Sequence, residues 1–357
     1  MPKEAPCLKV PKINAEKTLV LANKLGINDK TLEIPKESAD SICIPLTRKP
    51  EEGELELFIE QVPELQLDKR VFQEKNQLPK SLAQILEDQL APNLLASLPR
   101  ALDVVGDIAI IEIPPELETH KNVVGEAVLK THRNVRTVLA KAGAVSGTYR
   151  LREYDFIAGE HRTETLYKEY GCSYYVDVAR AYFSPRLSHE HDRVAALVQK
   201  NETVVDLFAG VGPFAVLIAK NHADAKVYAV DINADAIELL KKNIRLNRVE
   251  NRVHPIVGDA RQIVDEKLLG IADRVIMNLP EKASEFIDAA CKAIKPTGGF
   301  IHFYGFVRLP DTTENFKTRF SQAVEKAGKK VETFLYAETV RATAPYEWQV
   351  VLDAKIR

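Results

Sequence analysis

A glycine-containing turn after an apolar stretch is the first part of the sequence whose residues could bind a ligand. Residues 204–214 read VVDLFAGVGPF, which predicts a strand, a tight turn and the start of a helix. Gly210 and Gly212 would let the backbone approach a ligand where a Cβ atom would collide. Asp206 lies just before this turn. Asp231 follows the next apolar stretch, where a carboxylate can accept both hydroxyls of a ribose.

Two later strand ends carry polar residues suited to a nucleoside. Asp259 follows the third predicted strand, in a position to accept the amino group of an adenine. The fourth strand ends in Asn278-Leu279-Pro280, whose amide and rigid backbone carbonyl suit the edge of a flat base, although both residue types are also common in turns. Because the carboxyl ends of strands in open α/β sheets line one crevice, we expect these motifs to meet there.

The identity of the ligand depends on what surrounds the glycines. Residues 210–215 fit the pattern G-x-G-x-x-A, so a dinucleotide such as NAD is one candidate. Asp206, however, would repel a pyrophosphate and suit the ammonium of a methionine moiety, while Phe208 and Pro213 stiffen the turn. We therefore predict an S-adenosylmethionine site formed by Asp206, Phe208, Gly210, Gly212, Asp231, Asp259 and Asn278.

The elements that would position these residues alternate regularly from residue 188 onward. Strands are predicted at 203–207, 226–230, 253–257, 274–277 and 299–304, with a hairpin-like pair at 332–336 and 348–353. Helices fill the gaps, and this alternation is typical of a doubly wound parallel sheet, here mixed by the late pair. The predicted class is thus α/β, with a Rossmann-like domain preceded by two smaller α+β domains.

The first predicted domain spans residues 1–75. Apolar spacing followed by Gly26 predicts a helix over residues 15–25. Strands are predicted at 41–46 and 55–62, and the polar, proline-containing stretch 72–80 is predicted to be a linker.

The second predicted domain spans residues 76–185, before the final domain at 186–357. It contains a predicted helix from residue 82, a strand at 104–113, an amphipathic helix at 122–142, and strands at 148–156 and 174–182. Between residues 121 and 168, nine Lys and Arg stand against five Asp and Glu. We place three of these cations, Arg133, Arg136 and Lys141, on the polar side of the amphipathic helix, as phosphate contacts or as an ordinary solvated face.

Composition excludes several classes of protein. The 357 residues carry 49 Lys and Arg against 51 Asp and Glu, so the chain is not coated in positive charge, although charge can still be segregated between faces. No apolar run approaches the roughly 18 residues of a membrane span, and residues 1–14 contain no apolar leader. The four cysteines form no C-x-x-C pair and the eight histidines show no metal-ligand spacing. We therefore expect free thiols, a cytoplasmic location and no metal site.

Beside the glycine turn and Asn278-Leu279-Pro280, three other stretches carry a resemblance to a known family. They are LKVPK at 8–12, YRLREYDFIAGE at 149–160 and YFSPRLSHE at 182–190. With them, nearly the whole chain resembles the archaeal and eukaryotic tRNA (guanine-N1)-methyltransferases that modify position 37, next to the anticodon. The resemblance implies a class I methyltransferase domain, S-adenosylmethionine as cofactor, tRNA as partner, and a first domain that recognises the tRNA outer corner. We expect a monomer.

The resemblance also implies roles for single residues. Guanine N1 carries a proton, so the reaction needs a general base, and the family's S-x-E position makes Glu190 that base. The alternative is that Glu190 has no catalytic role and is a first-turn carboxylate whose charge complements the helix dipole. Arg150 and Arg152 are candidates to stabilise charge on O6, with Asn278 and Pro280 completing the catalytic set and Arg186 contacting RNA. His191 stands where the family usually has Arg, so no role is carried over to it.

Two other functions remain open. Related wyosine-pathway enzymes methylate the tricyclic base at position 37 or transfer an aminocarboxypropyl group to it, and Asn278-Leu279-Pro280 favours methyl transfer. A non-catalytic RNA-binding protein with a degenerate cofactor domain is the third alternative. Tyr182, Phe183 and Tyr346 could stack on an extruded guanine or simply belong to the core.

Overall fold

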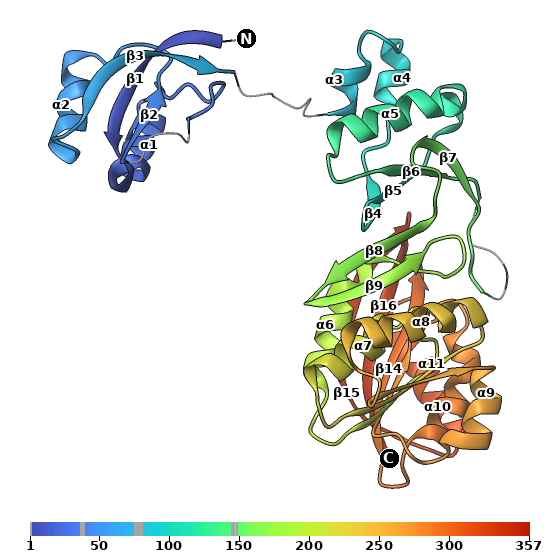
Figure 1. Cartoon of the computed structure of the whole chain (residues 1–357). Helices are drawn as coiled ribbons and strands as arrows, with labels where there is room; N and C mark the ends of the chain where they lie inside the picture. Colours follow the sequence, from blue (N-terminus) through green and yellow to red (C-terminus); the bar gives the residue numbers. More distant parts are fainter. Residues whose placement is uncertain (1, 36–39, 75–80, 144–146, 148) are drawn as a thin grey trace. The chain divides into compact units, whose positions relative to one another are not determined.

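The computed structural model describes residues 2–35, 40–74, 81–143, 147 and 149–357. Its contacts divide the chain into two compact units, Met1–Lys80 and Ser81–Arg357 (Figure 1). Residues 75–80 of the predicted linker and Thr148, the first residue of a predicted strand, lie outside the described residues. The border predicted near residue 185 lies inside the second unit.

The first unit is a small α+β fold. β1 (Pro2–Pro11) pairs antiparallel with β2 (Ser41–Pro45) on one side and with β3 (Gln66–Gln73) on the other, so the predicted linker begins inside a strand. A short 3-10 turn, η1 (Lys12–Asn14), leads into α1 (Ala15–Lys24), which confirms the predicted helix.

The prediction of a strand at 55–62 is wrong, because this stretch belongs to α2 (Glu52–Gln61). A capping box between Glu51 and Glu54 starts the helix. Phe58 is buried, whereas Leu57 and Ile59 on either side of it are largely exposed. The apolar run therefore supplies one core side chain to a helix.

The second unit begins with a four-stranded sheet and its helices. The sheet has the order β4-β5-β6-β7, with β5 and β6 parallel. The elements are α3 (Leu82–Leu86), α4 (Pro92–Ala96), β4 (Leu102–Val105), β5 (Ile108–Ile111), η2 (Pro115–His120), α5 (Lys121–Thr131), β6 (Thr137–Lys141) and β7 (Tyr154–Gly159). The strand predicted at 104–113 is a hairpin, because Gly106 has a φ of +60° and turns the chain between β4 and β5.

The single helix predicted at 122–142 is also wrong in its second half. α5 ends at Thr131, and residues 137–141 form the buried strand β6. Arg133 and Arg136 consequently lie in the exposed connection between the two, and Lys141 is the last residue of β6. The three cations do not share a helix face, because residues 137–140 pair with β5 instead of continuing the helix.

The main sheet has seven strands in the order β12-β11-β10-β13-β14-β16-β15. Its strands are β10 (Thr203–Asp206), β11 (Lys226–Asp231), β12 (Val253–Val257), β13 (Arg274–Met277), β14 (Gly299–Arg308), β15 (Val331–Ala344) and β16 (Glu347–Ile356). The first five are parallel, and β16 pairs antiparallel with both β14 and β15. This confirms the predicted mixed, doubly wound α/β class.

The strand order reverses at β10, whose neighbours are β11 and β13, so the ligand crevice is expected at their carboxyl ends. The connecting elements are η3 (Pro185–Leu187), α6 (Ser188–Leu197), α7 (Pro213–Asn221), α8 (Ala234–Asn247), α9 (Ala260–Ile263), the π-turn η4 (Val264–Leu268), η5 (Ala283–Phe286), α10 (Ile287–Ala293) and α11 (Thr313–Lys326).

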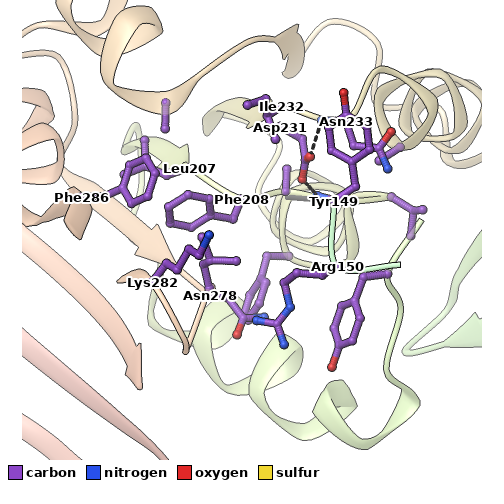
Figure 2. Close-up of a pocket in the computed structure, with 18 of the residues that line it drawn as sticks. Tyr149, Arg150, Leu207, Phe208, Asp231, Ile232, Asn233, Asn278, Lys282 and Phe286 are labelled. Carbon is purple, nitrogen blue, oxygen red and sulfur yellow. Dashed lines mark hydrogen bonds between the residues drawn. The ribbon is translucent and has the colours of Figure 1, made fainter. Parts of the chain in front are cut away.

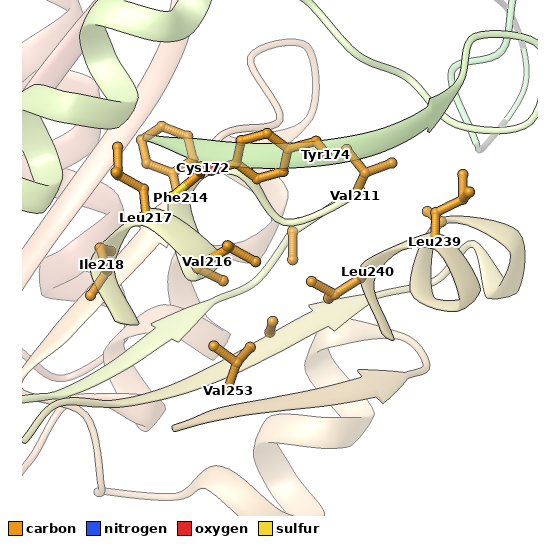
Figure 3. Close-up of a cluster of buried hydrophobic side chains, with 14 of the residues drawn as sticks. Cys172, Tyr174, Val211, Phe214, Val216, Leu217, Ile218, Leu239, Leu240 and Val253 are labelled. Carbon is orange, nitrogen blue, oxygen red and sulfur yellow. The ribbon is translucent and has the colours of Figure 1, made fainter. Parts of the chain in front are cut away.

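A two-stranded hairpin, β8 (Glu164–Glu169) and β9 (Cys172–Asp177), packs on α7 and α8. Figure 3 shows Tyr174 and Cys172 of this hairpin beside Phe214, within one buried cluster. Asn243 bonds the backbone N–H and C=O of Tyr175 at 2.6 and 3.1 Å. These bonds fix the hairpin next to the glycine turn, because Asn243 also donates to the Val211 carbonyl at 2.9 Å. β8 was not predicted, and the strand predicted at 174–182 ends at Asp177.

Candidate functional site

A pocket of about 300 Å³ opens at the carboxyl ends of β10, β11 and β13. Figure 2 draws Asp231, Asn278 and Arg150 around it, from three separate parts of the chain. Of the predicted cofactor residues, Phe208, Gly210, Asp231, Asp259 and Asn278 line the pocket. The structure therefore brings together cofactor residues that lie up to 70 residues apart in the sequence, from Phe208 to Asn278.

The glycine turn connects β10 to α7. Gly210 and Gly212 have φ angles of +55° and +89°, a region that side-chain-bearing residues rarely occupy. Gly212 is the N-cap of α7, and a Cβ atom on it would lie 2.2 Å from Leu240 Cδ1. Pro213 takes the first helical position, where a missing N–H costs nothing. Gly212 is thus needed for packing as well as for conformation, although it does not line the pocket itself.

Asp231 ends β11 and faces both the turn and the pocket. Its Oδ2 accepts the Gly210 N–H at 2.7 Å, and its Oδ1 accepts the Asn233 N–H at 2.9 Å. Burial raises the pKa of this carboxyl, while these backbone N–H groups oppose the rise. Each oxygen keeps a further lone pair, so the carboxylate can accept the two hydroxyls of a ribose.

Asp259 and two phenylalanines form the other end of the pocket. Asp259 caps α9 by accepting the Arg261 N–H at 2.8 Å through Oδ1, which leaves Oδ2 available. The rings of Phe208 and Phe286 meet edge to face at 5.0 Å, and the Arg261 guanidinium lies 4.0 Å from the Phe286 ring centre. Aromatic surface beside a carboxylate acceptor suits a flat base with an exocyclic amino group.

Asp206 is placed differently from the prediction. Its side chain is fully buried and is not part of the pocket lining. Oδ1 accepts the Phe208 N–H at 3.3 Å, while Oδ2 has no hydrogen-bond partner among the described residues. Burial raises the pKa of Asp206 to about 7. Asp206 therefore lies behind the glycine turn.

The structure separates the two candidate arginines. Arg150, at a φ of +55°, lines the pocket with its guanidinium 4.9 Å from the Tyr182 ring centre and 3.3 Å from a Glu281 oxygen. Its Nε is buried without a partner among the described residues. Arg152 instead donates to the Gly143 carbonyl at 2.8 Å and does not line the pocket.

The Asn278-Leu279-Pro280 motif reaches the same region. Asn278 and Leu279 line the pocket, as do Glu281 and Lys282 just beyond the motif. Pro280 is not part of the lining, so its contribution is to shape the loop.

Glu190 lies in the first turn of α6 behind the pocket wall. Only 4% of the residue is exposed. Its oxygens accept hydrogen bonds from the Arg193 guanidinium at 2.9–3.1 Å and from the Tyr304 hydroxyl at 2.7 Å. Leu187 and His191, on either side of it in the sequence, line the pocket.

Sequence reasoning missed the buried pair formed by His191 and Glu169. His191 Nδ1 lies 2.8 Å from Glu169 Oε1, and its ring meets Phe214 at 4.6 Å on the pocket wall. Tyr149, the first residue of the stretch 149–160, also lines the pocket, and four further lining residues lie within six residues after a motif: Ile232, Asn233, Lys282 and Phe286 (Figure 2). Their adjacency to the motifs was the available signal. No comparable signal links Glu169 to His191, because β8 was not predicted.

The predicted RNA contacts lie away from the pocket. Arg186 binds Asp103 at 2.5 Å, Lys141 lies 3.1 Å from Glu112, and Arg136 lies 3.8 Å from Glu160. Arg133 is exposed. Within the described ranges no cluster of acidic, His or Cys side chains could hold a metal ion, and no helix is long and apolar enough to cross a membrane.

Comparisons with known proteins identify the family of this chain. The model of the TRM5/TYW2 methyltransferase domain matches residues 165–333, and that of the TYW2 N-terminal domain matches residues 82–163. The tRNA (guanine(37)-N(1))-methyltransferase Trm5b of Pyrococcus abyssi is 38% identical over 351 residues, 98% of each chain. The tRNA 4-demethylwyosine(37)-methyltransferase Taw21 of Saccharolobus solfataricus is 35% identical over 277 residues, 77% of this chain and 99% of that protein.

A solved structure described as the complex of aTrm5 and tRNALeu matches with a TM-score of 0.73 at 35% identity, covering 98% of this chain and 99% of that one. The resemblance found in the sequence is thereby confirmed over the whole length. The chain belongs to the TRM5/TYW2 methyltransferase family.

Proposed function

We propose that this protein transfers a methyl group from S-adenosylmethionine to N1 of guanosine at position 37 of tRNA. The observation that carries the proposal is one pocket that joins a nucleoside-binding end, with Asp231 and Asp259, to a cationic end with Arg150 and Asn278. The relative from Pyrococcus abyssi, matched over 98% of each chain, carries this activity in its name.

The residues present fit the cofactor. The Asp231 carboxylate can hold the ribose, Asp259 Oδ2 can accept the adenine amino group, and the Gly210 turn leaves room for the backbone to approach the ligand. When bound, the cofactor supplies an electrophilic methyl group on a sulfonium. Asp206 would act on the cofactor's charge only through the turn, since its side chain does not line the pocket.

The chemistry at guanine requires two further groups. N1 becomes nucleophilic only when its proton leaves, and negative charge then accumulates on O6. Arg150 is positioned to stabilise O6, since its guanidinium lies on the pocket wall and Arg152 points elsewhere. Glu190 is the proposed general base. Asn278 and the loop at Pro280 would orient the edge of the guanine.

The rest of the chain is proposed to hold the tRNA. Residues 1–75 would recognise its outer corner, residues 76–185 would bind the stem through Arg133, Arg136, Lys141 and Arg186, and residues 186–357 would carry the reaction. The solved neighbour in complex with tRNALeu supports tRNA as the partner. We propose a monomer that acts in the cytoplasm, and light scattering with and without tRNA tests the first point.

The direct test is transfer of a tritiated methyl group from the cofactor into tRNA transcripts with G or A at position 37. We expect incorporation only with G, and 1-methylguanosine on nucleoside mass spectrometry. No incorporation, or equal incorporation into both transcripts, contradicts the proposal.

A second candidate function is methylation of a wyosine intermediate. The relative from Saccharolobus solfataricus, 35% identical to this chain, is named for that reaction. Mass spectrometry of tRNA that carries the tricyclic base separates the outcomes, because methyl and aminocarboxypropyl additions differ in mass. A purely RNA-binding role is less supported, since the glycine turn and its acidic partners are intact.

A further inference from the structure

Glu190 belongs to a group of buried polar side chains that runs from α6 across the main sheet. The group comprises Glu190 and Arg193 of α6, Tyr304 and His302 of β14, Asp353 of β16 and Arg274 of β13. Every member has a side chain that is at most 14% exposed. Buried charges persist in proteins only when they are paired and hydrogen-bonded.

Arg193 is the hub of this group. Its Nε lies 3.0 and 3.1 Å from the two Glu190 oxygens, and its Nη2 lies 2.9 Å from Oε2. The two terminal nitrogens of the same guanidinium bind Asp353, with Nη1 at 2.5 Å and Nη2 at 3.3 Å. One cation therefore bridges a helix carboxylate to a strand carboxylate.

Glu190 and Asp353 each have a second hydrogen-bond partner besides Arg193, and these partners differ. Tyr304, fully buried, donates its hydroxyl to Glu190 Oε2 at 2.7 Å. Asp353 lies 2.6 Å from His302 Nδ1. Although burial alone would raise it, His302 and Arg193 lower the pKa of Asp353 to about 2, so this carboxylate stays ionised.

We propose that Arg193 is a positioning residue for Glu190, whose carboxylate it holds and aims so that the carboxylate can accept the guanine N1 proton. This inference rests on the proposed function. A cation beside a buried carboxylate favours the charged form, which is the form that can accept a proton from substrate. Arg193 supplies that cation, and Asp353 anchors Arg193 to the sheet.

The geometry also indicates how the carboxylate would reach the substrate. Arg193 lies three residues after Glu190 on the same helix, so the two side chains share one face of α6. Tyr304 lies on β14, with its ring 6.1 Å from that of Phe214 on the pocket wall. On turning toward the pocket, Glu190 Oε2 would exchange the Tyr304 hydroxyl for the N1–H donor and keep its bonds to Arg193.

The proton and electron balance of the reaction explains why Arg193 has a second carboxylate partner, Asp353. The N1 proton passes to Glu190, the N1 electron pair forms the bond to the methyl carbon, and the carbon–sulfur bond breaks with its electron pair left on sulfur. Glu190 is then neutral. Arg193 is not left as an unpaired buried cation, because Asp353 still binds it. Glu190 afterwards returns its proton to water.

Four titratable or charged groups face the Glu190 carboxylate. They are Arg193 on its own helix, Tyr304 on β14, and Asp353 and Tyr336 across the sheet, the Tyr336 ring centre lying 4.4 Å from the Arg193 guanidinium. Arg193 is the only cation among these four named groups. Its removal should therefore move the pH dependence of methyl transfer more than the removal of any other member.

The test is the single-turnover rate of methyl transfer to G37 tRNA as a function of pH, with cofactor affinity and melting temperature measured in parallel. For Arg193→Gln we expect the acidic limb of the profile to move up by one pH unit or more, which is about a tenfold rate loss on that limb. The loss should shrink at high pH, with cofactor affinity unchanged. Arg193→Lys, which keeps the charge, should restore the limb.

Two further variants sharpen the test. In Asp353→Asn, Glu190 is the one remaining carboxylate partner of Arg193. The acidic limb of the profile should therefore stay in place or move to lower pH, opposite to the shift expected for Arg193→Gln. Arg245→Gln, at an exposed position of α8, is the control and should keep the wild-type profile. If Arg193→Gln does not fold, Arg193→Lys and Asp353→Asn carry the comparison.

A rate loss in Arg193→Gln that is equal at every pH, or an unshifted profile, overturns the positioning role. An active Glu190→Gln variant with a wild-type profile overturns it as well, since Glu190 would then not be the base. If instead the wild-type protein makes no 1-methylguanosine, the proposed function fails, which is a different and separately visible result.

Discussion

The backbone N–H of Gly210 donates a 2.7 Å hydrogen bond to the Asp231 carboxylate. This bond ties the turn after β10 to the carboxylate that ends β11, so the two parts of the nucleoside site share one geometry. Because Asn233 also donates to Asp231, the carboxylate is oriented before any ligand arrives. Such preorganisation lowers the cost of ordering side chains on binding.

Replacement of Asp231 by Ala should abolish cofactor binding and leave tRNA affinity largely intact, because the ribose loses its acceptor and the glycine turn loses its anchor. Isothermal titration with the cofactor and filter binding with tRNA measure the two. Asp224→Ala, an exposed carboxylate between α7 and β11, is the matched control. Unchanged cofactor affinity in Asp231→Ala would refute the site assignment.

The two glycines of the turn should respond differently to Ala. A left-handed conformation costs a residue with a side chain about 1–2 kcal/mol, which is the expected destabilisation of Gly210→Ala, where the nearest atom is 3.7 Å from the new Cβ. Gly212→Ala should lose about 1–3 kcal/mol more, because its Cβ would collide with Leu240. Urea unfolding of both variants checks this. Equal losses would show that Leu240 moves aside freely.

The buried Asp206 should make stability depend on pH. Its folded-state pKa of about 7 lies above the ordinary aspartate value of 3.8, because burial disfavours the charged form, so the folded state holds the proton more tightly. The loss of stability caused by ionising the buried Asp206 carboxylate is absent below pH 3.8, grows as the pH rises toward 7 and is complete above it. It amounts to up to ~4 kcal/mol. Asp206→Asn should therefore stabilise the protein at pH 8, with a difference that fades by pH 4 in denaturant titrations; a pH-independent difference would contradict this origin.

Arg150 and Arg152 provide a matched pair for the chemical step. Arg150→Ala should lower the single-turnover rate by about 10²-fold, the usual effect of losing one donor to a developing oxyanion, with cofactor affinity unchanged. Arg152→Ala should change the rate little, since its guanidinium is bound to the Gly143 carbonyl outside the pocket. Similar losses for both would mean that substrate binding rearranges this loop.

Arg133 and Arg136, exposed between α5 and β6, should contribute to tRNA affinity through phosphate contacts. Replacing either by Gln should lower the salt dependence of tRNA binding by about one unit of slope. Lys141→Gln should have a smaller effect, because its ammonium is paired with Glu112. Slopes unchanged from wild type would exclude this connection from the tRNA interface.

Two misassigned segments show the limit of local patterns. The stretch 55–62 was predicted to be a strand, but the Glu51 and Glu54 capping box starts a helix that runs to Gln61. In the stretch 122–142 the helical period continues past Thr131, yet Thr137–Lys141 pairs with β5. Pairing with a distant strand contributes more than local propensity, and periodicity does not report such pairing.

The sequence by itself determined the strand-end motifs, the doubly wound order and the family, because the glycine turn, Asp231, Asp259 and Asn278 each follow a recognisable apolar strand. The tertiary structure decided which charges meet. It placed Arg150 on the pocket and Arg152 off it, buried Asp206 behind the turn, and joined Glu190 through Arg193 to Asp353, 160 residues from Arg193 in the chain. Such contacts depend on side chains that the fold brings together from separate strands and helices, and spacing along the chain carries no record of them.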